Sequence, residues 1–185
     1  MDRKSTGGRK THVPSIREVR PSEELSSLFQ PAKIHFADCY EGQVDAAKLT
    51  AGRAAHAIFS APPRLALVLM SLRKRIVGLF GLKTPQDTRA VQPGSQRVGI
   101  FPVLYETADT IMLGMDDKHL DFRIFVSIHE ASDRSRITLS TFVSTKNTFG
   151  KIYLASVTPF HRLLSRHMLA LGLQRLDRES VRGRE

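Results

Sequence analysis

An alternating stretch near the middle of the chain, residues 114–128, most constrains how the protein can fold. It opens with Gly114 and the pair Asp116-Asp117, which are residue types that favour turns. Beyond the turn, apolar residues recur at every second position, which is the period of a β-strand with one buried face. The face expected toward the core carries Leu120, Phe122, Ile124, Val126 and Ile128, and the other carries His119, Asp121, Arg123, Phe125 and Ser127.

The second face of this strand carries three polar side chains in a row, His119, Asp121 and Arg123. Side chains two positions apart on a strand point the same way, so Asp121 can pair with either neighbour. One interpretation is an ion row at the surface or a polar ladder between strands. A second is ligand anchoring, in which Arg123 holds an anionic group and Asp121 orients His119. A third is proton transfer by His119, because histidine titrates near neutral pH.

The other segments predict an α+β chain whose helices and strands are segregated along the sequence. A short helical turn is expected after Ser22. A first strand is expected over residues 33–40, ending at Gly42, and a helix over residues 45–60, capped by Asp45. Apolar residues at helical spacing predict a second helix over residues 65–79. Strands are expected over 97–105, with Pro102 marking an edge or a bulge, and over 110–113 and 136–146.

A long final helix is predicted from Asn147, which can cap it, to about Leu173. Pro159 should bend this helix over the sheet, because proline lacks the N–H that the helical ladder requires. The bend is expected to open a gap bordered by Tyr153, Val157, Phe160 and Phe122. We expect a pocket of roughly 300–1,000 Å³ there, with His161 as its best polar group. Arg123 points away from Phe122 and reaches a ligand only near a sheet edge or bulge. The competing interpretation is that these aromatic residues are simply core.

The charge and the cysteine content of the chain limit the kinds of function that it can have. The net charge is +10. Residues 1–20 hold six basic and two acidic residues, and residues 162–185 hold six basic and three acidic ones. Basic ends are typical of solvated tails, with non-specific binding of nucleic acid or anionic lipid as the alternative. No zinc-ligand spacing, aromatic RNA-binding motif, Gly-rich phosphate loop or dinucleotide fingerprint is present, so no metal, cofactor or sequence-specific nucleic-acid partner is predicted. Cys39 is alone and no apolar run could span a membrane, which favours a cytoplasmic protein.

Three segments together resemble one bacterial family, domain of unknown function 2867: residues 114–123, residues 147–153 and residues 159–162. The resemblance covers about Ile34 to Leu173. Members of that family resemble the START and birch-allergen (SRPBCC) superfamily. The resemblance therefore implies a helix-grip fold, in which a curved antiparallel sheet with two short helices surrounds one long C-terminal helix. It also implies metabolite handling, because similar domains occur fused behind Rossmann oxidoreductase domains.

The domain organisation expected is a disordered basic tail over residues 1–20, a single helix-grip domain over 21–174 and a polar tail over 175–185. Removal of residues 1–20 is expected to leave folding intact, because their composition is polar, Gly-containing and aperiodic. The function expected is binding of a small hydrophobic or amphipathic ligand between sheet and helix. The alternatives are a general acid–base enzyme of cyclase or isomerase type that uses His119 or His161, and a basic surface that binds nucleic acid or anionic lipid.

Overall fold

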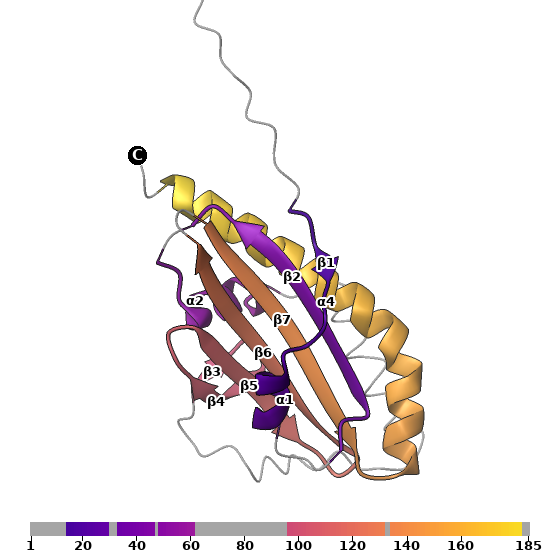
Figure 1. Cartoon of the computed structure of the whole chain (residues 1–185). Coiled ribbons are helices and arrows are strands. Elements are labelled where there is room, and N and C mark those ends of the chain that lie inside the picture. The colour runs from indigo at the N-terminus through magenta and orange to yellow at the C-terminus, as the bar shows by residue number, and fades with distance from the viewer. Residues whose placement is uncertain (1–13, 30–32, 47, 62–95, 132–133, 183–185) are drawn as a thin grey trace, which may run out of the picture.

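A computed structural model describes residues 14–29, 33–46, 48–61, 96–131 and 134–182. In chain order the elements are β1 (Arg17–Glu18), α1 (Glu23–Leu28), β2 (Phe36–Val44), α2 (Ala51–Phe59), β3 (Arg97–Val98), β4 (Phe101–Glu106), β5 (Thr110–Asp116), β6 (Leu120–Ala131), β7 (Arg134–Thr145) and α4 (Thr148–Arg182). The predicted helix over residues 65–79 lies outside the described residues. The α+β class, the antiparallel sheet and the long C-terminal helix are confirmed (Figure 1).

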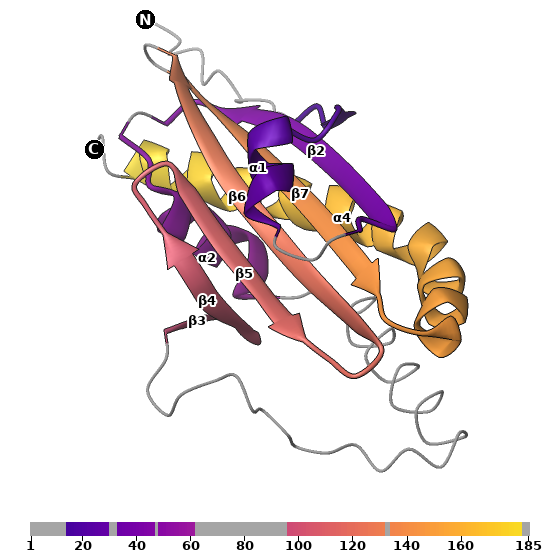
Figure 2. The same ribbon diagram turned by 60° about the horizontal axis from the view of Figure 1, so that its bottom comes forward.

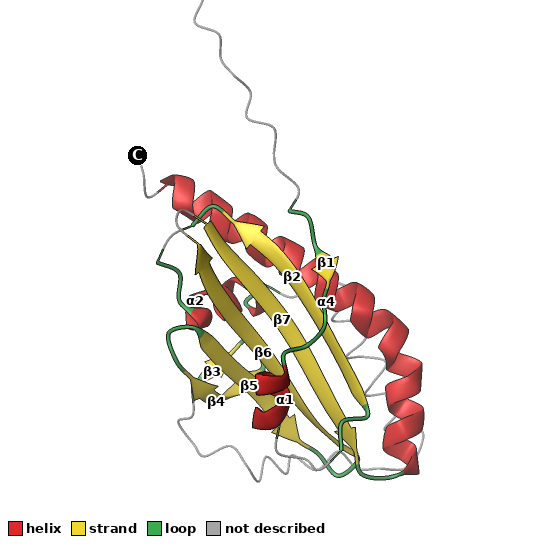
Figure 3. Ribbon diagram, viewed as in Figure 1, coloured by secondary structure: helices red, strands yellow, loops and turns green. Residues whose placement is uncertain are grey.

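The seven strands form one curved antiparallel sheet in the order β1-β2-β7-β6-β5-β4-β3. The longest pairing joins β6 to β7 and extends from Leu120 opposite Thr145 to Ala131 opposite Arg134. A register shift between Val103 and Tyr105 interrupts the pairing of β4 with β5, close to the edge or bulge that Pro102 predicts. Helices α2 and α4 cover the inner face of the sheet, and α1 lies on the outer face (Figures 2 and 3).

Several element boundaries differ from those predicted. Gly42 does not end β2 but lies inside it, where Leu173 and Ile16 occupy the space of a Cβ atom. Asp45 does not cap a helix, because α2 begins only at Ala51, and its side chain forms an ion pair with Arg134. The cap of α2 is instead Thr50, whose side chain accepts a hydrogen bond from the backbone N–H of the third helical residue.

Helix α4 begins where the sequence predicts it. The side chain of Asn147 accepts a hydrogen bond of 2.9 Å from the backbone N–H of Gly150, which satisfies one free donor of the first turn. Pro159 lies inside the helix, and the first part of α4 runs in a different direction from the rest in Figure 1. The helix continues to Arg182, well past Leu173, through residues that the sequence assigns to a polar tail.

The inner face of the sheet carries the main core. Ile124, Val126 and Ile128 of β6 are buried there, as the alternation predicts, together with residues of α2 and the second half of α4. The outer face departs from the prediction, because Phe125 is fully buried. Its ring meets Phe142 edge-on at 5.6 Å, under α1. A second, smaller core therefore lies on the face that the sequence assigns to polar residues.

The N-terminal segment is ordered further back than the tail expected over residues 1–20. Residues Arg17 and Glu18 pair with β2, and Ile16 packs against the main core. The guanidinium of Arg17 donates two hydrogen bonds, of 2.9 and 2.6 Å, to the buried carboxylate of Glu41. The folded region therefore includes residues before Pro21.

A chain that begins at Pro21 is expected to be less stable than one that begins at Pro14. Loss of the ion pair with Arg17 leaves Arg136, at 3.7 Å, as the only described cation beside the carboxylate of Glu41. This loss should lower the free energy of unfolding by about 2 kcal/mol. For a chain of this size the cost corresponds to a melting temperature about 4–8 °C lower by calorimetry. The variant Arg17→Ala in the longer chain separates the contribution of the ion pair to stability from that of the strand pairing. Equal melting temperatures for the two truncated chains would support the prediction of a tail over residues 1–20.

Candidate functional site

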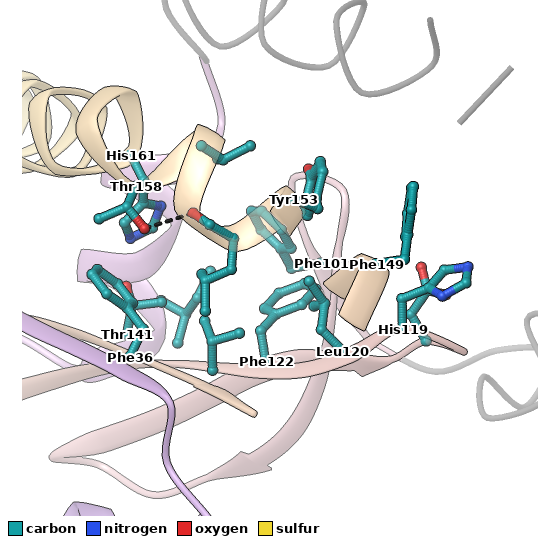
Figure 4. Close-up of a pocket in the computed structure, with 15 residues that line it drawn as sticks. Phe36, Phe101, His119, Leu120, Phe122, Thr141, Phe149, Tyr153, Thr158 and His161 are labelled. Atoms are coloured by element: carbon teal, nitrogen blue, oxygen red, sulfur yellow. Dashed lines mark hydrogen bonds between the residues drawn. The ribbon is translucent and has the colours of Figure 1, made fainter. Parts of the chain in front are cut away.

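A cavity of about 210 Å³ lies between the inner face of the sheet and the first half of α4. It is smaller than the range that we predicted from the sequence. Its walls are mainly aromatic and aliphatic, with polar side chains toward its two ends (Figure 4). The lining residues are Phe36, Phe101, Asp117, His119, Leu120, Phe122, Ile124, Thr141, Val143, Phe149, Tyr153, Leu154, Val157, Thr158 and His161.

Strand pairing builds the floor of the cavity. Phe122 on β6 lies opposite Val143 on β7, and Val143 lies opposite Phe36 on β2. Residues directly opposite each other in an antiparallel sheet share a face, so these three side chains form one apolar row. Two positions along, Ile124 lies opposite Thr141. The floor is therefore apolar, with one hydroxyl from Thr141.

Helical spacing builds the roof. Phe149, Tyr153, Val157 and His161 recur every four residues on one side of α4, and all of them line the cavity. The hydroxyl of Thr158 donates a 2.7 Å hydrogen bond to the carbonyl of Leu154, one turn earlier, and so is satisfied within the helix (Figure 4). The part of α4 up to His161 thus faces the cavity, and the part from Ser165 onward packs on the core.

His161 marks the inner end of the cavity. Its imidazole meets the ring of Phe36 edge-on at 5.6 Å, and its Nε2 lies 3.3 Å from the hydroxyl of Ser165. The same nitrogen lies 3.5 Å from a carboxylate oxygen of Asp38. The side chain of Asp38 is 1% exposed and that of His161 is 26% exposed. The cavity therefore ends at a histidine backed by a buried carboxylate.

A second buried polar group accompanies Asp38 on β2. Tyr40 lies two residues further along the strand, on the same face, and is fully buried. Burial, followed by the nearby carboxylate of Asp38, raises the pKa of Tyr40 to about 12. The phenol of Tyr40 is therefore neutral at physiological pH, and Asp38 is the acidic group of this cluster.

The opposite end of the cavity carries His119, next to the N-terminus of α4 (Figure 4). Its Nδ1 lies 3.0 Å from the side-chain amide nitrogen of Asn147, and its ring stacks at a tilt on Phe149 at 4.7 Å. The backbone carbonyl of His119 also accepts a hydrogen bond of 2.8 Å from the backbone N–H of Lys146. These contacts tie the turn before β6 to the start of α4.

The residues predicted for the site divide into two groups. Tyr153, Val157, His161, Phe122 and His119 all line the cavity. Phe160 does not line it, although we predicted that it would. It is 47% exposed, because it lies about 100° around the helix from His161 and points toward solvent.

The row of His119, Asp121 and Arg123 does not act as one unit. Asp121 forms an ion pair of 2.6 Å with Lys146 instead of orienting the histidine. Arg123 forms an ion pair of 2.7 Å with Asp116, on the face of the sheet away from the cavity. Hydrogen bonding from Arg123 lowers the pKa of Asp116 below its usual value. His119 precedes the first residue of β6, so the strand alternation does not fix its direction.

Sequence reasoning missed Asp38, although a signal was present. Asp38 lies on the same strand face as Phe36 and Tyr40, and a carboxylate on an otherwise aromatic face is the pattern of a buried polar site. Its partner His161 lies on the last helix, so only the fold brings the two together. The sequence pattern also does not place Thr141 next to Asp38, its direct strand partner.

Two features are absent from the described residues. Within residues 14–182, leaving out the undescribed gaps, no three His, Cys, Asp or Glu side chains gather closely enough to hold a metal ion. Over the same part of the chain, no helix combines the length and the apolar character needed to cross a membrane.

Comparison of the sequence with protein-family models gives a match. A family model described as "Protein of unknown function (DUF2867)" matches residues 31–168, which include β2, α2, the sheet from β3 to β7 and the first half of α4. The matched region thus contains every residue that lines the cavity, and Asp38. No curated protein is matched.

Proposed function

The chain belongs to the DUF2867 family, and we propose that it binds a small, largely apolar molecule in the cavity under α4. The observation that carries this proposal is the composition of the cavity. Most of its lining residues are aromatic or aliphatic, and a histidine lies toward each of its two ends. Apolar walls with a few fixed polar groups are the usual pattern of sites for small ligands.

The volume of the cavity limits the size of the ligand. A dry cavity of about 150 Å³ holds a benzene ring, and the cavity under α4 measures about 210 Å³. A benzene ring with a two-carbon side chain therefore fits, whereas a sterol or a long lipid chain is too large for the cavity in this conformation. His161, at the inner end, is the polar group placed to contact a substituent on such a ligand.

A filling substitution tests the proposal. Val157→Phe should weaken binding of ethylbenzene about tenfold or more, because the larger side chain takes up space in the cavity. Binding can be followed by saturation-transfer NMR of the dissolved hydrocarbon. Ile152→Phe is the matched control, since Ile152 lies on the same helix but is 66% exposed. Both variants should keep the circular dichroism spectrum of the natural protein.

Two outcomes would count against the proposal. If ethylbenzene binds the natural protein and Val157→Phe equally well, the site lies elsewhere. If the hydrocarbon does not bind the natural protein at all, the cavity does not act as a binding site.

An acid–base enzyme is the second candidate, and the buried carboxylate beside His161 favours it. A carboxylate beside a histidine at the end of an apolar cavity is an arrangement that general acid–base catalysis uses. The two functions differ in their effect on a bound ketone. An enzyme of this type would accelerate deuterium exchange at the methyl carbon next to the carbonyl of acetophenone, and His161→Gln would remove the acceleration. A binding module would leave the exchange rate unchanged.

A further inference from the structure

The inner end of the cavity is short of hydrogen-bond donors. Neither carboxylate oxygen of Asp38 has a hydrogen-bond partner among the residues that the structure describes, although both are inaccessible to solvent. The nitrogen of His161 at 3.5 Å is within reach for an ion pair, but this distance is long for a hydrogen bond. The hydroxyl of Tyr40 is buried without a partner as well. Two neighbouring polar side chains therefore remain unsatisfied.

An unsatisfied buried carboxylate is costly, because removing a charge from water is offset only by a cation or by several donors. Apart from His161, the described residues around Asp38 provide no such cation or hydrogen-bond donor. Its neighbours on the strand face are the rings of Phe36 and Tyr40. The guanidinium of Arg162 lies over the ring of Phe36, 5.9 Å from its centre, and Arg162 is exposed to solvent. The end of the cavity thus combines negative charge with aromatic faces.

We infer that the ligand carries a hydrogen-bond donor at its polar end, as an alcohol or, preferably, a protonated amine, and that carboxylic acids are excluded. This inference rests on the proposed binding function. A donor placed beside His161 supplies what the end of the cavity lacks, by a bond to one nitrogen of the imidazole while the other nitrogen faces Asp38. A cation is also attracted by the aromatic rings of the walls, whereas an anion is repelled by Asp38.

Four molecules of almost equal size test the inference. 2-Phenylethylamine is cationic at pH 7, 2-phenylethanol is neutral with one donor, ethylbenzene has no polar group, and phenylacetate is anionic. Isothermal titration calorimetry on the full chain should rank them in that order. The amine should bind about tenfold or more tightly than phenylacetate, which corresponds to 1.4 kcal/mol.

The variant Asp38→Asn identifies the group responsible. It removes the negative charge at nearly constant shape, so the preference for the amine over phenylacetate should fall to less than threefold. If this variant unfolds, as its circular dichroism would reveal, the ranking of the four molecules by the natural protein still decides the inference.

The failures of the two proposals are distinguishable. If ethylbenzene binds and Val157→Phe blocks it, but phenylacetate binds as well as the amine, only the donor inference is overturned. If none of the four molecules binds, the proposed function is overturned together with it. A preference for the amine that persists in Asp38→Asn would also contradict the inference, because its cause would then lie outside Asp38.

Discussion

Phe125→Ala is expected to lower the free energy of unfolding by about 3–5 kcal/mol, the usual cost of truncating a buried aromatic residue. The ring is fully buried on the outer face of the sheet, in contact with Phe142. Phe142 in turn stacks on Phe29, just after α1, so the truncation removes the centre of the second core. Urea denaturation, followed by circular dichroism, measures the loss.

Phe122→Ala is the matched control on the same strand. From its position on the inner face alone, the sequence predicts an equally large cost for this residue. In the structure Phe122 is only partly buried and borders the cavity, so part of its surface has no packing partner to lose. We therefore expect a cost of about 1–2 kcal/mol. A smaller loss for Phe125→Ala than for Phe122→Ala would mean that the outer core contributes little.

Gly172→Val is expected to cost about 3 kcal/mol, because α4 and α2 touch at this glycine. A Cβ atom at position 172 would lie 2.5 Å from the side chain of Ile58 and 3.1 Å from its Cα atom. The backbone of α2 would have to move. Replacing a glycine within a helix normally increases stability by up to about 1 kcal/mol. A decrease in stability of about 3 kcal/mol would therefore be due to the steric clash. The same urea titration serves as the measurement.

Ala155→Val controls for the helical preference of valine. Ala155 is exposed on the same helix, so this change introduces the branched side chain without a clash and should cost about 0.5 kcal/mol. Equal effects of the two substitutions would show that α2 and α4 are not packed as closely at Gly172 as the structure has them.

The sequence predicted the strand that builds half of the site, because alternation determines which side chains share a face. Ile124 and Val126 are buried on the face that their period assigns. The same rule failed for Phe125, since periodicity identifies two faces but does not reveal that α1 covers the second one. It failed for His119 because that residue lies in the turn, where no strand pairing sets its direction.

The helical part of the site was also predictable, whereas the approach of its buried acid to His161 was not. Tyr153, Val157 and His161 follow from the spacing along α4. The approach of Asp38 to His161 depends on how the last helix crosses β2, and nothing local to either residue encodes that crossing. Phe160 shows the limit of the helical argument, because residues three and four positions after Val157 both fit one helix face, and the residue that meets the cavity is His161.

The proline within α4 divides the helix into parts with different local stability. Pro159 cannot donate a hydrogen bond to the carbonyl of Ala155, so the ladder is interrupted there. Beyond it, six residues from Ser165 to Leu176 are buried, whereas Gly150 is the one buried residue before it. In amide hydrogen exchange the first part should therefore open well below the global unfolding energy. A ligand in the cavity would give this part the contacts that it lacks, so binding and protection from exchange are thermodynamically linked.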